Sequence, residues 1–185
     1  MALTNASLGQ VLEIYGAMTE RTLLLHPHLV LPMKISSSAA RTTQREGAEA
    51  LEKLLATNGI VSVPDGEKFL MIVPKAEALK ARPGSSQITR GKNSTGKQEV
   101  IPAGMIDFRG ATAAQVLSIY TALKSRKPEL AGPSPPIPIN LRAETTLTRE
   151  EALYAMETLF AWQGFKVVPI GEEFLKFAPL SGSER

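Results

Sequence analysis

One stretch of the chain has the residue types of a phosphate-binding loop. Over positions 91–98, two Gly-Lys pairs are separated by Asn-Ser-Thr, and the second pair is followed by Gln98. A working loop of this kind has Ser or Thr after its lysine to hold magnesium, and it joins a strand to a helix. Gln98 occupies that position here, and Pro102 follows too soon for a helix. The stretch is therefore interpreted as a solvated linker.

The chain has only two histidines, His26 and His28, and they flank Pro27. Two imidazoles could contribute to a metal site, but a closed site needs more ligands at a set geometry. The chain contains no cysteine to complete one. We therefore expect the histidines to be incidental to the end of a strand, and we predict neither a metal nor a cofactor.

The rest of the sequence contains no pattern typical of catalysis. It shows no nucleophile elbow, no paired catalytic carboxylates and no cysteine–histidine pair. An enzyme built from this chain would depend on carboxylates, serine or lysine, and no spacing singles any of them out. No catalytic residue is predicted. An unrecognised hydrolase is therefore the functional hypothesis with the least support.

The strongest pattern is an internal duplication. A shift of 105 residues aligns positions 7–74 with positions 112–179 and gives 22 identities in 68 ungapped positions. Chance would give only a handful, so the chain contains one module twice. The predicted organisation is a first domain at 1–75, a flexible basic linker at 76–104, a second domain at 105–180 and a tail at 181–185.

Both copies carry the same helix signals. Thr148 and Glu151 have the spacing of a capping box, and Gly164 supplies the left-handed residue that ends a helix. The apolar stripe between them is formed by Leu153, Met156, Leu159, Phe160 and Gln163. An earlier helix begins at Ser7 in the first copy and at Thr112 in the second.

Short apolar runs supply the strands, and a Pro-Asp-Gly turn at Pro64 joins the last two strands of the first copy. Each copy reads as β-α-β-β-α-β-β, an α/β (α+β) domain with two helices packed on a small mixed sheet. Two departures are expected. The first copy has only residues 1–3 for its opening strand, which predicts a truncated strand. The proline-rich segment 127–136 is predicted to be an edge or a loop.

The charge of the chain is concentrated in the linker. The net charge is +3, and six basic and two acidic residues lie between Lys75 and Glu99. The two domains thus carry no electrostatic footprint typical of nucleic-acid binding. No window approaches the roughly 18 apolar residues of a membrane span. No signal peptide is visible, as in a processed or recombinant fragment.

Several segments resemble the periplasmic N-terminal domains of bacterial secretins. The second copy carries this resemblance at 107–112, 146–152 (Thr-Leu-Thr-Arg-Glu-Glu-Ala) and 164–169 (Gly-Phe-Lys-Val-Val-Pro). The first copy carries it at 24–27 and 58–64. The resemblance implies small KH-like domains that stack into rings around a secretion or pilus channel and contact inner-membrane partners. The barrel domain of secretins is absent from this sequence, which indicates a fragment or a separate protein with the ring-building module.

The resemblance implies a non-enzymatic assembly or adaptor module of a type II secretion or type IV pilus system. Such a module would be periplasmic, would contact copies of itself or other proteins of the system, and would belong to an outer-membrane-associated complex. The alternative is a KH-like nucleic-acid-binding protein. That module clamps the nucleic-acid backbone with a Gly-x-x-Gly loop, which this sequence lacks. Nucleic acid is therefore not the expected partner.

One helix face differs between the copies. In the first copy it carries Glu49, Lys53 and Thr57, which are typical of a solvated face. The equivalent positions in the second copy are Tyr154, Thr158 and Trp162. An aromatic pair on such a face suits a protein contact surface. Tyr154 and Trp162 are therefore the candidate interaction residues; the other interpretation is that they pack within their own domain, for instance on the proline-rich segment.

Overall fold

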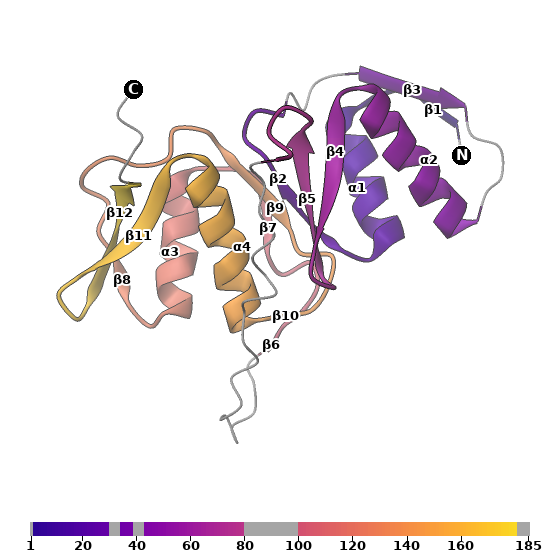
Figure 1. Cartoon of the computed structure of the whole chain (residues 1–185). Coiled ribbons are helices and arrows are strands. Elements are labelled where there is room, and N and C mark those ends of the chain that lie inside the picture. The colour runs from indigo at the N-terminus through magenta and orange to yellow at the C-terminus, as the bar shows by residue number, and fades with distance from the viewer. Residues whose placement is uncertain (1, 30–33, 39–42, 80–99, 181–185) are drawn as a thin grey trace. The chain divides into compact units, whose positions relative to one another are not determined.

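The structure is a computed structural model, and it describes residues 2–29, 34–38, 43–79 and 100–180. The chain divides into two compact units, Met1–Ser86 with Ala143–Thr145, and Gln87–Arg142 with Thr146–Arg185. Figure 1 labels the helices and strands of both. The loop-like stretch at 91–98 and the expected tail at 181–185 lie outside the described residues.

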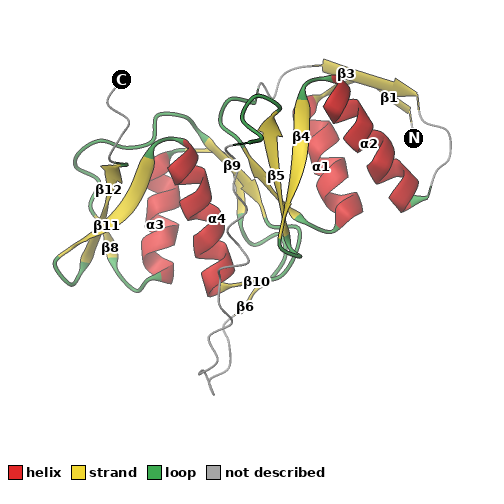
Figure 2. Cartoon of the chain, viewed as in Figure 1, coloured by secondary structure: helices red, strands yellow, loops and turns green. Residues whose placement is uncertain are grey.

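The described residues of the first unit form two helices and five strands. Its elements are β1 (Ala2–Ser7), α1 (Leu8–Thr19), β2 (Thr22–Leu25), β3 (Lys34–Ser38), α2 (Gln44–Thr57), β4 (Ile60–Asp65) and β5 (Phe69–Pro74). β5 lies between β2, which is parallel to it, and β4, which is antiparallel. β1 and β3 form a separate antiparallel pair (Figure 2).

The second unit repeats this arrangement and adds one strand pair. Its elements are β6 (Val100–Ile101), β7 (Asp107–Ala111), α3 (Ala113–Leu123), β8 (Lys127–Pro128), β9 (Ile139–Arg142), β10 (Leu147–Thr148), α4 (Arg149–Trp162), β11 (Phe165–Ile170) and β12 (Phe174–Pro179). β12 lies between β11 and the short parallel strand β8, and β7 pairs with β9. The added pair joins β6, at the C-terminal end of the expected linker, to β10.

The predicted fold class is confirmed, because each unit has two helices and a small mixed sheet. The strands of each copy do not form a single sheet: β1 pairs with β3, and β7 with β9, apart from the three-stranded sheets β2-β5-β4 and β11-β12-β8. The expected truncation of the opening strand is wrong: β1 has six residues and pairs with β3 from Ala2 onward. Of residues 127–136, Lys127–Pro128 form the short edge strand β8, and residues 129–136 are in no strand.

The β1–β3 and β7–β9 pairs contain the same irregularity. The register shifts between Leu3 and Ala6 in β1, and between Phe108 and Ala111 in β7, which are equivalent positions. Such a bulge bends the strand and increases its local twist. The copies thus share a local distortion as well as a topology.

All four helices begin with the capping box that the sequence predicts for them. In α4 the backbone N–H of Thr148 donates to Glu151 Oε2 at 2.7 Å, and the backbone N–H of Glu151 donates to Thr148 Oγ1 at 3.2 Å. In α2 the backbone N–H and the hydroxyl of Thr43 both donate to Glu46 Oε2, and these bonds lower the pKa of Glu46. Gly164, at φ 80°, follows the last turn of α4 as predicted. Each box satisfies backbone donors that a helix start would leave free.

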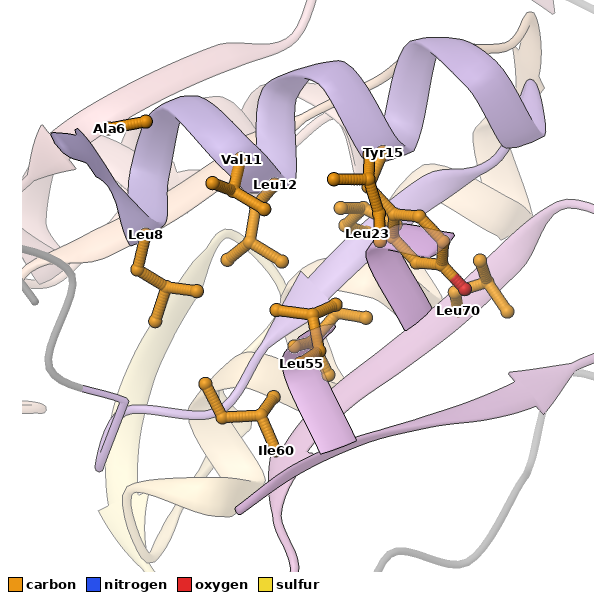
Figure 3. Packing of buried hydrophobic residues seen from close by; sticks show 11 residues of the cluster. Ala6, Leu8, Val11, Leu12, Tyr15, Leu23, Leu55, Ile60 and Leu70 are labelled. Carbon is orange, nitrogen blue, oxygen red and sulfur yellow. The ribbon is translucent and has the colours of Figure 1, made fainter. Parts of the chain in front are cut away.

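The core of the first unit lies between its helices and its strands. Figure 3 shows side chains of α1, among them Leu8, Leu12 and Tyr15, directed toward Leu55 of α2 and Ile60 of β4. The second unit buries the positions equivalent to Leu8, Leu12, Tyr15 and Leu55, whereas Phe165, at the position of Ile60, is half-buried. The predicted stripe of α4 is buried from Leu153 to Phe160. No helix among the described residues is long and apolar enough to cross a membrane.

Candidate interaction surface

The two helices of each unit are joined by a buried tyrosine and a glutamate. In the second unit the Tyr120 hydroxyl donates directly to Glu157 Oε1 at 2.5 Å. In the first unit the equivalent Tyr15 hydroxyl donates to Ser62 Oγ at 3.3 Å, and the Ser62 hydroxyl donates to Glu52 Oε1 at 2.9 Å. The same two elements are thus linked in both copies, with a serine hydroxyl inserted in only one.

The surroundings of both tyrosines oppose ionisation. Burial raises the pKa of Tyr120 above its ordinary value, and the nearby Glu157 carboxylate raises it further. Burial also raises the pKa of Tyr15, and the Ser62 hydroxyl partly offsets that effect. A neutral phenol keeps its proton and donates a hydrogen bond, which is what both tyrosines do.

The helix face on which the candidate residues lie is different in the two units. On α2, Glu49, Lys53 and Thr57 are all exposed, and Glu49 accepts a bond from Arg45 at 3.2 Å. On α4, Tyr154, Thr158 and Trp162 are half-buried. Tyr154 and Trp162 both interact with other residues of the chain. The structure therefore places both aromatic residues on one partly accessible face, as their spacing predicts.

A residue that the sequence pattern assigned to the apolar stripe makes polar contacts instead. Gln163 Oε1 accepts a bond from the Ile137 backbone N–H at 2.9 Å, and Gln163 Nε2 donates to the Ile137 carbonyl oxygen at 3.0 Å. The amide thus holds the end of the proline-rich segment against the end of α4, and Pro135 in that segment is buried. The side chain of the equivalent Asn58 donates within its own helix, to the Leu54 carbonyl oxygen at 2.7 Å. The sequence signal for this contact was a polar residue at the end of an apolar stripe.

The outer faces of the three-stranded sheets also differ. Alternate side chains of a strand point to opposite faces, and Leu70 and Ile72 of β5 belong to the core beneath the helices. The other face of β5 therefore carries Phe69, Met71 and Val73, which are buried. The equivalent residues of β12 are Phe174, Lys176 and Ala178, which are exposed or half-buried. This face is thus apolar in the first unit and mixed in the second.

Exposed apolar side chains are concentrated in the second unit. Among the described side chains, the large apolar ones that are exposed there are Val100, Met105, Ile119, Leu130, Ile170 and Phe174. Among the described side chains of the first unit, the large apolar one that is exposed is Leu79. Ile170 and Phe174 pair with each other at the tip of the β11–β12 hairpin. The equivalent tip of the first unit, Asp65 and Phe69, is buried.

The two histidines lie side by side after β2. Their ring centroids are 4.9 Å apart, and the His28 backbone N–H donates to His26 Nδ1 at 3.3 Å. Within the part of the chain that the structure describes, no group of three or more His, Cys, Asp or Glu side chains could hold a metal ion. The local contacts of the pair are those of a turn at the end of a strand.

No protein-family model and no curated protein matches the sequence. Five chains of solved structures match it, and two of them illustrate the likeness. One is a dimeric mutant of the N-terminal domain of the secretin XcpQ from Pseudomonas aeruginosa, with 16% identity, a TM-score of 0.36, and coverage of 87% of this chain and 96% of that chain. The other is XcpQN012, with 17% identity, a TM-score of 0.36, and coverage of 87% and 95%.

Proposed function

We propose that this chain is a non-enzymatic assembly or adaptor module of a secretin-type secretion or type IV pilus system. It contains two secretin-N-like domains, at 1–75 and 105–180, and works in the periplasm. Its partners are copies of itself or other proteins of that system. The motif resemblance at 146–152 and 164–169 supports the choice of system, and the differences between the copies support the mode of action.

One observation carries the proposal: the duplicated units retain their internal framework while their outer faces diverge. The caps, the bulges and the tyrosine–glutamate connections are shared. The exposed polar face of α2 is equivalent to the aromatic face of α4. Divergence of the outer faces is expected when each copy contacts a different protein surface, because a contact surface favours aromatic residues and a solvated face does not.

Solution behaviour separates the proposal from the nucleic-acid alternative. We expect the mass measured by light scattering to rise with protein concentration and the chain to show no tight, steeply salt-sensitive RNA binding in a gel shift. Nucleic-acid binding through basic side chains falls steeply with salt, because counterions are released. Tight RNA binding with such a salt dependence, together with a constant monomer mass, would overturn the proposal.

The Trp162→Ser variant tests the aromatic face itself, with Thr57→Ser at the equivalent position of the first unit as the matched control. We expect Trp162→Ser to weaken association while leaving the unfolding transition in place, and Thr57→Ser to change neither. If Trp162→Ser lowers the stability of the chain and leaves association unchanged, Trp162 packs within its own domain and the interface assignment is wrong.

A further inference from the structure

The outer edge of β4 has backbone groups that no described strand pairs with. β4 is the last strand in the order β2-β5-β4. The backbone N–H of Lys75 donates to the Gly59 carbonyl oxygen at 2.8 Å. Bonded pairs alternate along an antiparallel ladder, so the next bonded residue of β4 after Gly59 is Val61. Ile60 and Ser62 therefore direct their N–H and C=O groups away from β5.

A second bond supports this assignment. The backbone N–H of His26, just after β2, donates to the Ile72 carbonyl oxygen at 3.0 Å. Ile72 is the residue opposite Ser62, and its backbone faces β2 instead of β4. The Ser62 side chain is held by Tyr15 and Glu52, which fixes this part of the edge in an extended conformation.

A proline limits how far the edge can pair. Pro64 is the next residue of β4 whose backbone points outward, and it has no N–H to donate. The open part of the edge is therefore confined to Ile60–Ser62 and is short. Pro169 has the same place in β11, whose outward residues are Phe165 and Val167 by the same alternation, since the Leu180 N–H donates to the Gly164 carbonyl oxygen at 2.8 Å.

We infer that β4 pairs in antiparallel orientation with β4 of a second copy of this chain, with Val61 opposite Val61 of the partner subunit. In this register, Ile60 and Ser62 of one copy exchange their backbone hydrogen bonds with Ser62 and Ile60 of the partner subunit. The two valines then form the non-bonded pair, in which Cα atoms are about 4.5 Å apart and side chains are closest. Half-buried β-branched side chains suit that position.

A difference between the copies indicates that the partner of this edge is β4 of a second copy. β11 has the same length, the same outward groups and the same proline, but Lys166 stands at the position of Val61 and is exposed. Self-pairing of β11 would place two lysines directly opposite each other, which is destabilising. Val61 carries no such charge. Self-pairing is thus open to β4 and opposed at β11. This inference rests on the proposed function, since it specifies one of the contacts by which the module assembles.

The test uses opposite charges at one position. Val61→Lys and Val61→Glu are made in the full chain, and each variant alone is expected to weaken self-association about tenfold or more, because like charges face each other across the twofold axis. An equimolar mixture of the two variants is expected to regain association, because lysine then faces glutamate. Sedimentation velocity over a concentration series measures both effects. Lys166 at the equivalent position indicates that the module folds with a lysine there.

Val63→Lys is the matched control, because Val63 lies on the same face of β4 but beyond the pairing residues. It should associate like the unaltered chain. If the chain associates but Val61→Lys does not weaken it, or if the mixture fails to regain association, the β4 pairing is wrong while the proposed function stands. If the chain is monomeric at every concentration, the pairing is overturned and the proposed self-assembly with it.

Discussion

The interiors of the two units are more alike than their surfaces. Tyr15 reaches Glu52 through the Ser62 hydroxyl, whereas Tyr120 reaches Glu157 directly, because Val167 replaces the serine. The connection between the helices survives this change. On the outside, equivalent positions differ in chemical character. Tyr154 stands where the first copy has Glu49, and Lys166 stands where it has Val61. The difference indicates that the framework has one structural task in both copies and that the faces have separate tasks.

The largest effect is expected in the core of the second unit. Phe160 is fully buried, and its ring lies 4.8 Å from Phe177 and 6.1 Å from Tyr120. Phe160→Ala should lower the free energy of unfolding by about 3–5 kcal/mol. Because Trp162 is the only tryptophan of the chain, its fluorescence during urea denaturation reports this unit. Leu55→Ala, at the equivalent place of the first unit, should leave the Trp162 transition in place; a common shift in both variants would mean that the units unfold together.

The tyrosine–glutamate contact gives the next largest effect. Tyr120→Phe removes a hydroxyl that donates to a carboxylate, and a hydrogen bond to a charged group contributes about 1.5–3 kcal/mol. Glu157 is exposed and can be hydrated, so we expect a loss near the lower end of that range. Tyr15→Phe removes a bond between neutral groups and should cost about 0.5–1.5 kcal/mol. Urea midpoints of the two variants measure the difference, and an equal loss in both would remove this distinction between the copies.

Alkaline conditions should weaken both units, the second more than the first. The pKa values of Tyr120 and Tyr15 are raised in the folded chain, chiefly by burial, from an ordinary value of 10.0. Above that pH the unfolded chain loses these protons while the folded chain keeps them, so stability falls as pH rises. The decline should be shallower in Tyr120→Phe than in the unaltered chain. Urea midpoints from about pH 9 to about pH 11 test this, and parallel pH profiles would contradict it.

The smallest effect is expected at the helix caps, where the copies agree. Thr148→Ala removes the hydroxyl that accepts a bond from the Glu151 N–H, and loss of such a cap costs about 1 kcal/mol. Thr43→Ala makes the same change in the first unit and should have an effect of similar size or smaller. Thermal unfolding measures both. A much larger loss at either site would show that the threonine has a further role.

The shared framework could be predicted from the sequence, because it depends on local signals. Capping boxes, helix-ending glycines and the periodic stripe all lie within a few residues of each other. The long-range contacts could not be predicted in the same way. The bond from Ser62 to Glu52 and the double contact of Gln163 with Ile137 join residues 10 and 26 positions apart. The pairing of β1 from Ala2 was missed because a short polar strand carries little apolar alternation.

The candidate surface was only partly predictable. Spacing places Tyr154 and Trp162 on one face, but it does not indicate that both are half-buried. The open edge of β4 has no sequence signal of its own, because backbone direction depends on the ladder register. Pro64 marks where that edge ends, and this becomes apparent only once Gly59 and Lys75 are known to pair.

An exchange of helix faces tests the central claim most directly. A triple variant with Tyr154→Glu, Thr158→Lys and Trp162→Thr gives α4 the face of α2. Its mass by light scattering and its urea unfolding curve, followed by far-UV circular dichroism, are compared with those of the unaltered chain. If the framework and the faces have separate tasks, the variant unfolds cooperatively near the original midpoint and associates less. An unfolded variant, or a folded one with unchanged association, would contradict this account.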